Sequence, residues 1–148
     1  MTQPEPKDIG RKRDRQIIDH VARHRITTNP VLHRLFFAGR RPNAVTKVTS
    51  RLCRAEWLRK FPLYRPLPYF TLGRLAAKRL GVPIGHTLPL GPQALPTEFA
   101  TLSYVIDKPR HVRLTADELR QLCPWLTGPL ADFPYCLDES SKPSVLEL

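Results

Sequence analysis

The chain has 148 residues, enough for one globular domain or for one small domain with a satellite, and too few for a large enzyme barrel. Hydrophobic residues make up 41% and charged residues 25%, so a packed core is expected and disorder over the full length is excluded. The 16 prolines, about twice the usual share, predict short and frequently interrupted elements.

The net charge of +11 is concentrated in the first half of the chain. Residues 1–80 contain 19 Lys and Arg against 5 Asp and Glu, a net charge of +14, which leaves −3 for residues 81–148. Such a surplus repels itself unless a polyanion neutralises it. The first half therefore predicts a nucleic-acid partner.

Targeting signals and cysteine frameworks are not indicated. No stretch approaches the roughly 20 apolar residues that cross a bilayer, and the N-terminus lacks the apolar segment of a secretory signal, so we expect a cytoplasmic protein without membrane contact. The cysteines are odd in number and widely spaced, at Cys53, Cys123 and Cys136. They predict buried, inert thiols rather than disulfides or a zinc site.

Two helices are predicted after a disordered tail over residues 1–9. The first covers residues 11–24, with an inward stripe made by Ile17, Ile18, Val21 and Ala22. The second follows a cap residue and a proline in the segment 27–30, and Gly39 ends it. Its expected buried residues are Val31, Leu32, Leu35 and Phe36.

A third helix is predicted to begin in the segment 40–43, again with a proline near its start. Its inward stripe is Ala44, Val45, Val48, Leu52 and Ala55. The opposite face carries Asn43, Thr46, Lys47, Ser50 and Arg54, with Arg51 and Cys53 at its margins. No acidic residue occurs from residue 40 to residue 55, which is unusual because surface helices normally mix both signs of charge.

A hairpin and a fourth helix complete the first half. The aromatic and branched runs 57–61 and 69–72 predict two strands, and the basic segment 62–68 between them predicts the turn, because its prolines cannot donate to a ladder. The fourth helix covers residues 73–80, and Gly81 ends it. Its expected inward residues are Leu75, Ala76 and Leu80.

The second half predicts a proline-rich linker over residues 82–96 and a small, mostly helical α/β appendage over residues 97–148. The appendage starts with a helix that begins at Thr97 and ends at Asp107. Phe99, Leu102, Val105 and Ile106 mark this helix, and the helix is the expected homodimer or partner surface. Residues 111–114 predict a strand, 115–118 a capping box and 133–137 another strand. Residues 144–148 form either a final strand or the edge of a longer protein.

The element order in the first half resembles a winged helix-turn-helix, so the expected fold class is α+β. The resemblance is carried by the segments RDRQII (13–18), TTNPVLHRLFF (27–37), AVTKVTSRLCRAEWLR (44–59) and YFTLG (69–73). They are similar to the replication-relaxation family of plasmid and mobile-element proteins, and more distantly to MarR-type regulators. About 65 of the 148 residues are covered. Where the family usually has a glycine before the first wing strand, this chain has Glu56 and Trp57.

The resemblance implies a winged-helix domain over residues 10–81 that binds double-stranded DNA, either sequence-specifically or structure-selectively, as a transcriptional regulator or as an accessory factor of replication or of a mobile element. It places the third helix in the major groove and the hairpin on the backbone. Asn43 would read adenine, Lys47 and Arg54 would read guanine, and the remaining residues would mainly position the protein. The expected DNA-binding residues are Arg40, Arg41, Asn43, Thr46, Lys47, Ser50, Arg51, Arg54, Arg59, Lys60 and Arg65.

Two other binding functions stay open. The winged helix could act as a protein-interaction scaffold within a nucleic-acid complex. Alternatively, the aromatic residues interleaved with the basic residues of the hairpin could stack on single-stranded bases or RNA. The simpler interpretation of these aromatics, Trp57, Tyr64, Tyr69 and Phe70, is that they pack the hairpin onto the helices.

No enzymatic function, cofactor or metal is predicted. His20 and His24 have metal-compatible spacing, but no third ligand is near in sequence, so ordinary surface or boundary histidines are expected. Asp117 and Glu118 are explained as first-turn helix residues. Cys136 has no base partner, and the nearby acidic residues would raise its pKa. There is no glycine-rich phosphate loop.

Overall fold

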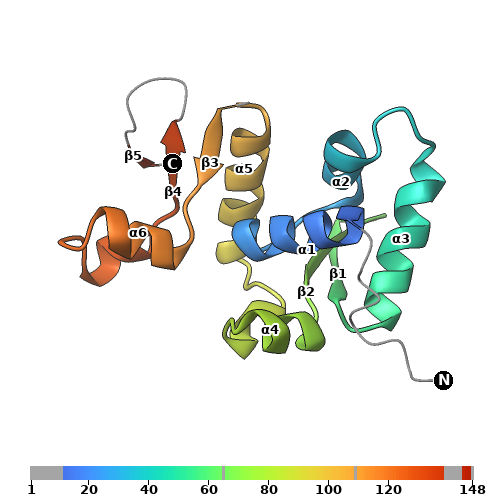
Figure 1. Ribbon diagram of the computed structural model, residues 1–148, viewed down its shortest axis with the longest axis horizontal. Coiled ribbons are helices and arrows are strands. Elements are labelled where there is room, and N and C mark those ends of the chain that lie inside the picture. Colours follow the sequence, from blue (N-terminus) through green and yellow to red (C-terminus); the bar gives the residue numbers. More distant parts are fainter. Residues whose placement is uncertain (1–11, 65, 109, 139–144, 148) are drawn as a thin grey trace. The chain divides into compact units, whose positions relative to one another are not determined.

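The computed structural model describes residues 12–64, 66–108, 110–138 and 145–147, and these residues form an α+β protein, as expected (Figure 1). They contain six α-helices, two short 3-10 helices and two small antiparallel sheets. The chain divides into two compact units, Met1–Leu95 and Pro96–Leu148. The predicted tail over residues 1–9 lies outside the described residues.

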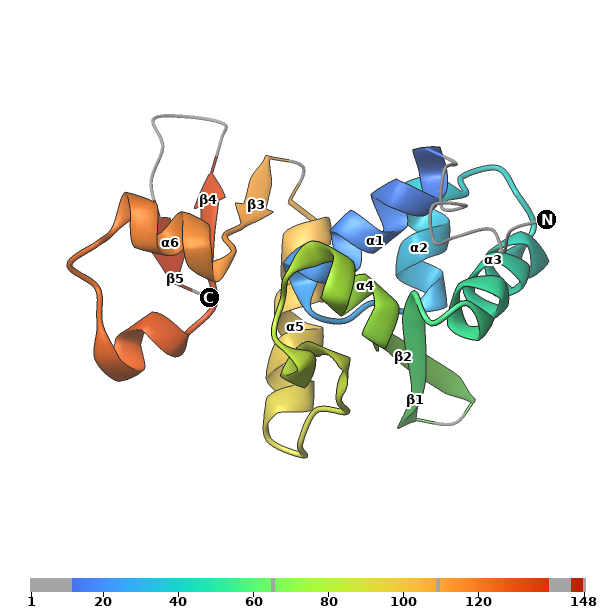
Figure 2. The same cartoon turned by 60° about the horizontal axis from the view of Figure 1, so that its bottom comes forward.

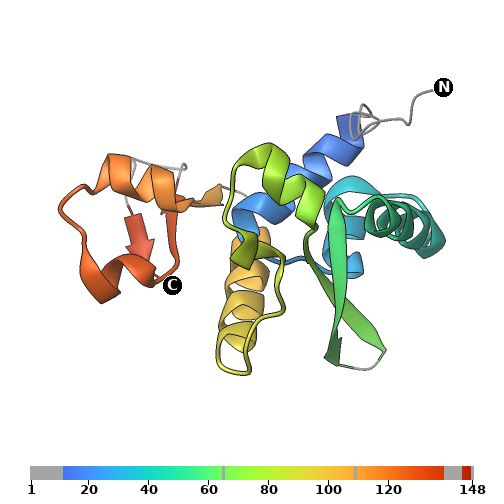
Figure 3. The same ribbon diagram turned by 90° about the horizontal axis from the view of Figure 1, so that it is seen from below.

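The first unit has the predicted order of three helices, a hairpin and a further helix. Its elements are α1 (Lys12–His24), α2 (Asn29–Phe36), α3 (Pro42–Arg54), β1 (Leu58–Tyr64), β2 (Leu67–Leu72), α4 (Arg74–Leu80) and the 3-10 helix η2 (Ile84–Thr87). The hairpin projects from the helices, with its base beside α4 (Figures 2 and 3). This arrangement is compatible with the winged helix predicted from the sequence.

One hydrophobic core joins the three N-terminal helices to the base of the hairpin. The predicted stripes of α1 and α3 are its main contributors, and its largest side chains include Ile17, Leu32, Phe37, Leu52 and Phe70. Three predicted inward residues are wrong, because Leu35 is 41% exposed, Leu80 is 43% exposed, and Ala55, which lies just beyond the end of α3, is exposed as well. α2 ends at Phe36, and Phe37 just beyond the helix turns into the core instead.

The segment between α1 and α2 pairs with the hairpin. The Thr27 amide donates to the Phe70 carbonyl at 3.0 Å, and the Phe70 amide donates to the Thr27 carbonyl at 2.8 Å. Beside this bridge, Nε2 of His20 is hydrogen-bonded to Oγ1 of Thr27 at 2.8 Å. The expectation that His20 and His24 lie at the surface or boundary is wrong, since both are 8% exposed. Apolar periodicity misses them because their inward position depends on partners outside the helix.

Burial lowers the pKa of His20 to about 4, because protonating the ring would place a positive charge where water cannot solvate it. The unfolded chain takes up this proton near pH 6.5, whereas the folded protein resists it until about pH 4. Acid therefore favours unfolding, and we expect the free energy of unfolding to fall by about 2 kcal/mol between pH 7 and pH 5. Urea titrations at the two pH values measure this. In His20→Gln the drop should shrink by more than half, and an unchanged drop would assign it to other groups.

The hairpin is longer than predicted. β1 and β2 pair from Leu58 opposite Leu72 to Tyr64 opposite Leu67, with an irregularity between Pro62 and Tyr64. The predicted turn over residues 62–68 is therefore wrong, because most of it is strand. Pro62 lies opposite Pro68, a pair in which neither residue can donate across the ladder. Both prolines are tolerated because they form a non-hydrogen-bonded pair, in which the backbone nitrogens of both residues point away from the partner strand, to the outer edges of the hairpin.

A tight junction anchors the start of α4 to the start of the hairpin. The Gly73 amide donates to the Trp57 carbonyl at 2.8 Å, and the Leu75 amide donates to the Glu56 carbonyl at 3.1 Å. A Cβ at position 73 would lie 2.2 Å from the Glu56 carbonyl oxygen. Glu56 itself has φ +64°, so it adopts the left-handed conformation that glycine favours although it is not a glycine.

The predicted linker over residues 82–96 is wrong for most of its length, because the segment folds onto the hairpin. Thr87 is fully buried, and its carbonyl accepts hydrogen bonds from Arg59 at 2.9 Å and from the Thr71 hydroxyl at 3.4 Å. Farther along, the Leu90 amide donates to the Tyr69 hydroxyl at 2.9 Å. These hydrogen bonds leave no periodic pattern in the sequence, so the prolines alone predicted an irregular linker.

The second unit contains most of α5 (Ala94–Ile106), then β3 (His111–Arg113), α6 (Ala116–Leu122), the 3-10 helix η3 (Gly128–Asp132), β4 (Tyr135–Asp138) and β5 (Val145–Glu147). The strands form an antiparallel sheet in the order β3-β4-β5, so the chain forms a strand within residues 144–148. The predicted capping box is confirmed, since Thr115 and Glu118 exchange hydrogen bonds. A small core consists of Leu119, Cys123 and Tyr135.

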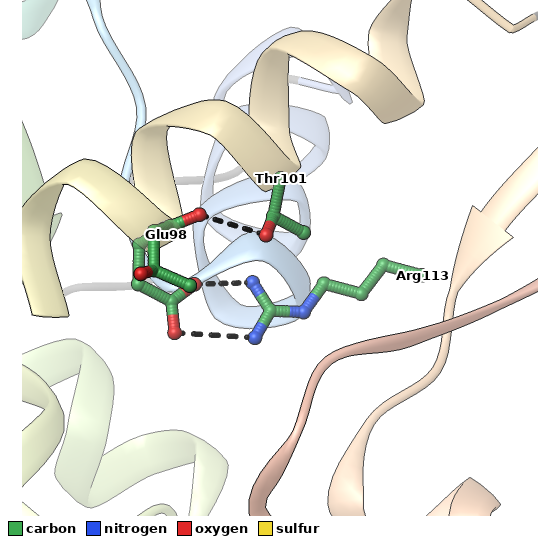
Figure 4. Close-up of polar contacts among 4 residues, drawn as sticks. Glu98, Thr101 and Arg113 are labelled. Atoms are coloured by element: carbon green, nitrogen blue, oxygen red, sulfur yellow. Dashed lines mark hydrogen bonds and ion pairs between the residues drawn. The ribbon is translucent and has the colours of Figure 1, made fainter. Parts of the chain in front are cut away.

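A bidentate ion pair fastens α5 to β3 (Figure 4). The Arg113 guanidinium donates to the two carboxylate oxygens of Glu98 at 2.5 and 3.3 Å, and the Thr101 hydroxyl donates to the Thr97 carbonyl one turn earlier. Of the apolar residues on the helix expected to form a dimer, Leu102 and Val105 are buried within the chain. The apolar surface available to a second copy is therefore smaller than expected, and the homodimer stays a prediction.

Candidate nucleic-acid interface

The outward face of α3 is built as the helical periodicity predicts. Val45, Val48 and Leu52 are buried against the core, and the Thr49 hydroxyl is satisfied within the helix by the Val45 carbonyl at 3.1 Å. On the other side all five predicted groove-facing residues are exposed, namely Asn43, Thr46, Lys47, Ser50 and Arg54. The face presents amide, hydroxyl and cationic groups together.

The turn before α3 places two more cations at the start of this face. Arg40 and Arg41 are both exposed, and Gly39 has φ +82°, a conformation that side chains disfavour. The His33 ring donates from Nε2 to the Arg40 carbonyl at 2.6 Å, and the Arg40 amide donates to the Phe37 carbonyl at 2.9 Å. These bonds fix the backbone between α2 and α3, so the two arginines extend from a defined turn.

Arg51 differs from the other predicted contacts because it has an internal partner. Its guanidinium donates to both carboxylate oxygens of Asp14 at 2.9 and 3.1 Å, and the Asp14 side chain is fully buried. The bond joins α3 to the first turn of α1. The structure therefore gives Arg51 a role in holding the two helices together.

The predicted hairpin contacts fall into three situations. Lys60 is exposed, whereas Arg59 is half-buried, where it donates to the Thr87 carbonyl and lies 5.1 Å from the centre of the Phe61 ring. Arg65 lies outside the described residues. Lys60 lies close enough to Cys53 of α3 to lower the pKa of that thiol, although burial raises it by more. Lys60 of β1 therefore lies beside α3, whereas Arg59 is directed to the Thr87 segment.

The aromatic residues of the hairpin divide between the core and the surface. Trp57, Tyr69 and Phe70 are buried, so their predicted packing role is confirmed. Tyr64 is 60% exposed at the end of β1. Of this group, only Tyr64 can offer a ring face to a base.

A groove that the sequence did not predict lies between α3 and the hairpin. It has a volume of about 430 Å³ and is lined by residues that include Asn29 from the start of α2, Thr46 from α3, and Lys60, Phe61 and Tyr64 from β1. The side-chain Oδ1 of Asn29 is buried, and no hydrogen-bond partner for it exists among the described residues. Only the folded hairpin brings these positions together.

Side chains that could bind a metal ion do not cluster in the described residues. No group of three or more His, Cys, Asp or Glu side chains among them could hold a metal ion. The pKa of the Cys136 thiol is raised by burial and by the nearby Asp138, as expected, and a raised pKa keeps a thiol protonated and unreactive. Every helix in the described part of the chain is too short or too polar to cross a bilayer.

The α3 face, its two preceding arginines and the groove beside the hairpin thus form one candidate surface. Comparison with protein-family models, with curated proteins and with solved structures found no match for this chain.

Proposed function

We propose that residues 12–81 form a winged helix-turn-helix that binds double-stranded DNA. In this arrangement α3 enters the major groove and the hairpin lies along the backbone. The protein would act as a transcriptional regulator or as an accessory factor of replication or of a mobile element, in line with the replication-relaxation family that its motifs resemble. The buried stripe of α3 and its exposed opposite face support this arrangement.

The observation that carries the proposal is the composition of the exposed α3 face. Five polar or cationic side chains point away from the core, no acidic residue occurs between residues 40 and 55, and residues 1–80 carry a net charge of +14. Asn43 can bond adenine, and Lys47 and Arg54 can bond guanine, through the major-groove edges of these bases. Arg40 and Arg41 would contact phosphates, together with Lys60 of β1.

Because phosphate contacts release counterions, the affinity for duplex DNA should fall steeply with salt. We expect the logarithm of the binding constant to fall linearly with the logarithm of salt concentration, with a slope of several units. Lys47→Ala and Arg54→Ala should each reduce discrimination between a selected site and random duplex by about 1–3 kcal/mol. Lys60→Ala should instead weaken all sequences alike and reduce the slope by about one.

Fluorescence anisotropy with a site selected from random duplexes measures both quantities. Lys78→Ala on α4 is the matched control, since it removes one exposed positive charge from a different element. A flat salt response would contradict DNA binding and favour a protein-interaction scaffold, and tighter binding to single-stranded RNA would favour the RNA alternative. If the α3 and hairpin variants behave alike, the assignment of the base-reading face is wrong.

A further inference from the structure

The groove between α3 and the hairpin has the size and lining of a site for a small flat ligand. Its volume of about 430 Å³ lies in the range of small-molecule sites. Its walls combine an aromatic ring, prolines and aliphatic carbon with a few polar groups. This combination favours a ligand that is planar, partly apolar and able to form hydrogen bonds.

Asn29 and Thr46 are the two uncharged polar residues that line the groove. Oδ1 of Asn29 is buried, and the described residues offer it no hydrogen-bond donor. Buried polar atoms normally have partners, because an unmade hydrogen bond in the interior costs free energy. Because this Oδ1 has almost no accessible surface, a ligand in the groove cannot reach it, and the hydroxyl of Thr46, an exposed residue of α3 that lines the groove, is the polar group open to a ligand.

Tyr64 gives the groove an exposed aromatic face. Its side chain is 60% exposed, although large apolar rings are usually covered, and Phe61 lines the groove with it. The Phe61 ring is braced behind by Tyr69, with ring centres 5.6 Å apart, and by Arg59. Because side chains alternate along a strand, the Phe61 ring shares the face of Arg59 and lies opposite Lys60, so the exposed Tyr64 ring is the surface that suits stacking against a nucleobase.

The surroundings are cationic, which selects a ligand attached to phosphates. Lys60 lines the groove, and Lys47 follows Thr46 directly on the exposed face of α3. A free nucleobase would gain nothing from these charges, whereas a base that remains in a DNA strand brings its phosphates to them. The base must be unpaired, because a base inside a duplex is stacked and its hydrogen-bonding edge is occupied.

We propose that this groove binds one unpaired nucleobase of DNA, stacked on Tyr64 beside the Thr46 hydroxyl, while α3 holds the adjoining duplex. The inference rests on the proposed DNA binding and refines it, since the preferred ligand becomes a duplex with a local distortion. Neither α3 nor the hairpin needs to change position to form this site, because both of its walls exist in the structure.

The test compares three DNA ligands that share one flanking sequence: a perfect duplex, the same duplex with a single unpaired adenine, and the same duplex with an abasic nucleotide in place of that adenine. We expect the full chain to bind the unpaired adenine at least about fivefold more tightly than the perfect duplex. The abasic ligand should lose this preference, because it keeps the distortion and the phosphates but offers no ring.

Variants assign the preference to the groove. Tyr64→Ala should abolish it and leave affinity for the perfect duplex within about twofold, whereas Tyr64→Phe should retain it. Trp125→Ala is the matched control, since Trp125 is a 74% exposed aromatic residue of the second unit.

The outcomes separate this inference from the function on which it rests. If the chain binds none of the three ligands, DNA binding itself is wrong. If it binds all three equally, or if Tyr64→Ala keeps the preference, DNA binding stands and the groove inference is overturned. A preference that survives in the abasic ligand would show that bending of the duplex, and no base, is recognised.

Discussion

Arg51→Met should lower the free energy of unfolding by about 3 kcal/mol at neutral pH, one of the two largest effects that we expect from a single substitution. The variant leaves the fully buried Asp14 carboxylate without the guanidinium that now bonds both of its oxygens. A buried charge without a partner costs more than the pair contributes, because it has lost its water and gained nothing in return. Denaturant unfolding followed by circular dichroism measures the difference.

Asp14→Asn combined with Arg51→Met is the informative control. The double variant removes the isolated charge, so it should be about 1–2 kcal/mol more stable than Arg51→Met alone. The folded Arg51→Met protein should bind duplex DNA within about twofold of the unaltered chain. In the unaltered chain the Arg51 guanidinium is already bonded to Asp14, so its loss should remove no DNA contact. A loss of less than 1 kcal/mol together with a large loss of affinity would return Arg51 to the DNA-contacting set.

The second large effect is expected from Gly73→Ala. The added Cβ would lie 2.2 and 2.5 Å from the carbonyl oxygen and carbon of Glu56, and 2.9 Å from the Leu58 amide nitrogen. These are backbone atoms, which cannot rotate away, so the start of α4 must separate from the start of β1. We expect a loss of about 3 kcal/mol, seen as a melting temperature lowered by roughly 10 °C.

Gly91→Ala is the matched control for this substitution. Nothing lies within 4 Å of a Cβ at Gly91, and its φ is ordinary, so its stability should change by less than about 0.5 kcal/mol. If Gly73→Ala and Gly91→Ala have the same melting temperature, the junction between Glu56 and Gly73 is looser than the distances indicate.

Local sequence signals predicted most of the first unit. Apolar residues at helical spacing gave α1 and α3 almost to the residue, and the same spacing gave the exposed set on α3. The Thr115 capping box was found because its two reciprocal hydrogen bonds lie within four residues. These predictions succeed because the cause and the signal occupy the same short stretch of chain.

Features that depend on distant partners were missed. Arg51 was assigned to DNA because Asp14 is 37 residues away and no local pattern joins them. The buried positions of His20 and Thr87 depend on Thr27 and Arg59 in the same way. The groove combines α2, α3 and β1, so Asn29 carried no signal, although the exposed ring of Tyr64 was among the aromatics considered for stacking.

The facing prolines of the hairpin also limit the pairing of its edges with a further strand. The Phe70 nitrogen points out of the hairpin to reach Thr27. Inward and outward nitrogens alternate along each strand, so the nitrogens of Pro62 and Pro68, in the second pair along from Phe70, also point outward. Because proline has no N–H, neither outer edge of the hairpin can donate a hydrogen bond to an incoming strand at the Pro62–Pro68 pair. Lys60, two residues before Pro62, adds a positive charge to the edge of β1. A projecting ribbon without such features would invite strand addition and aggregation, so this one can extend into solvent without recruiting neighbours.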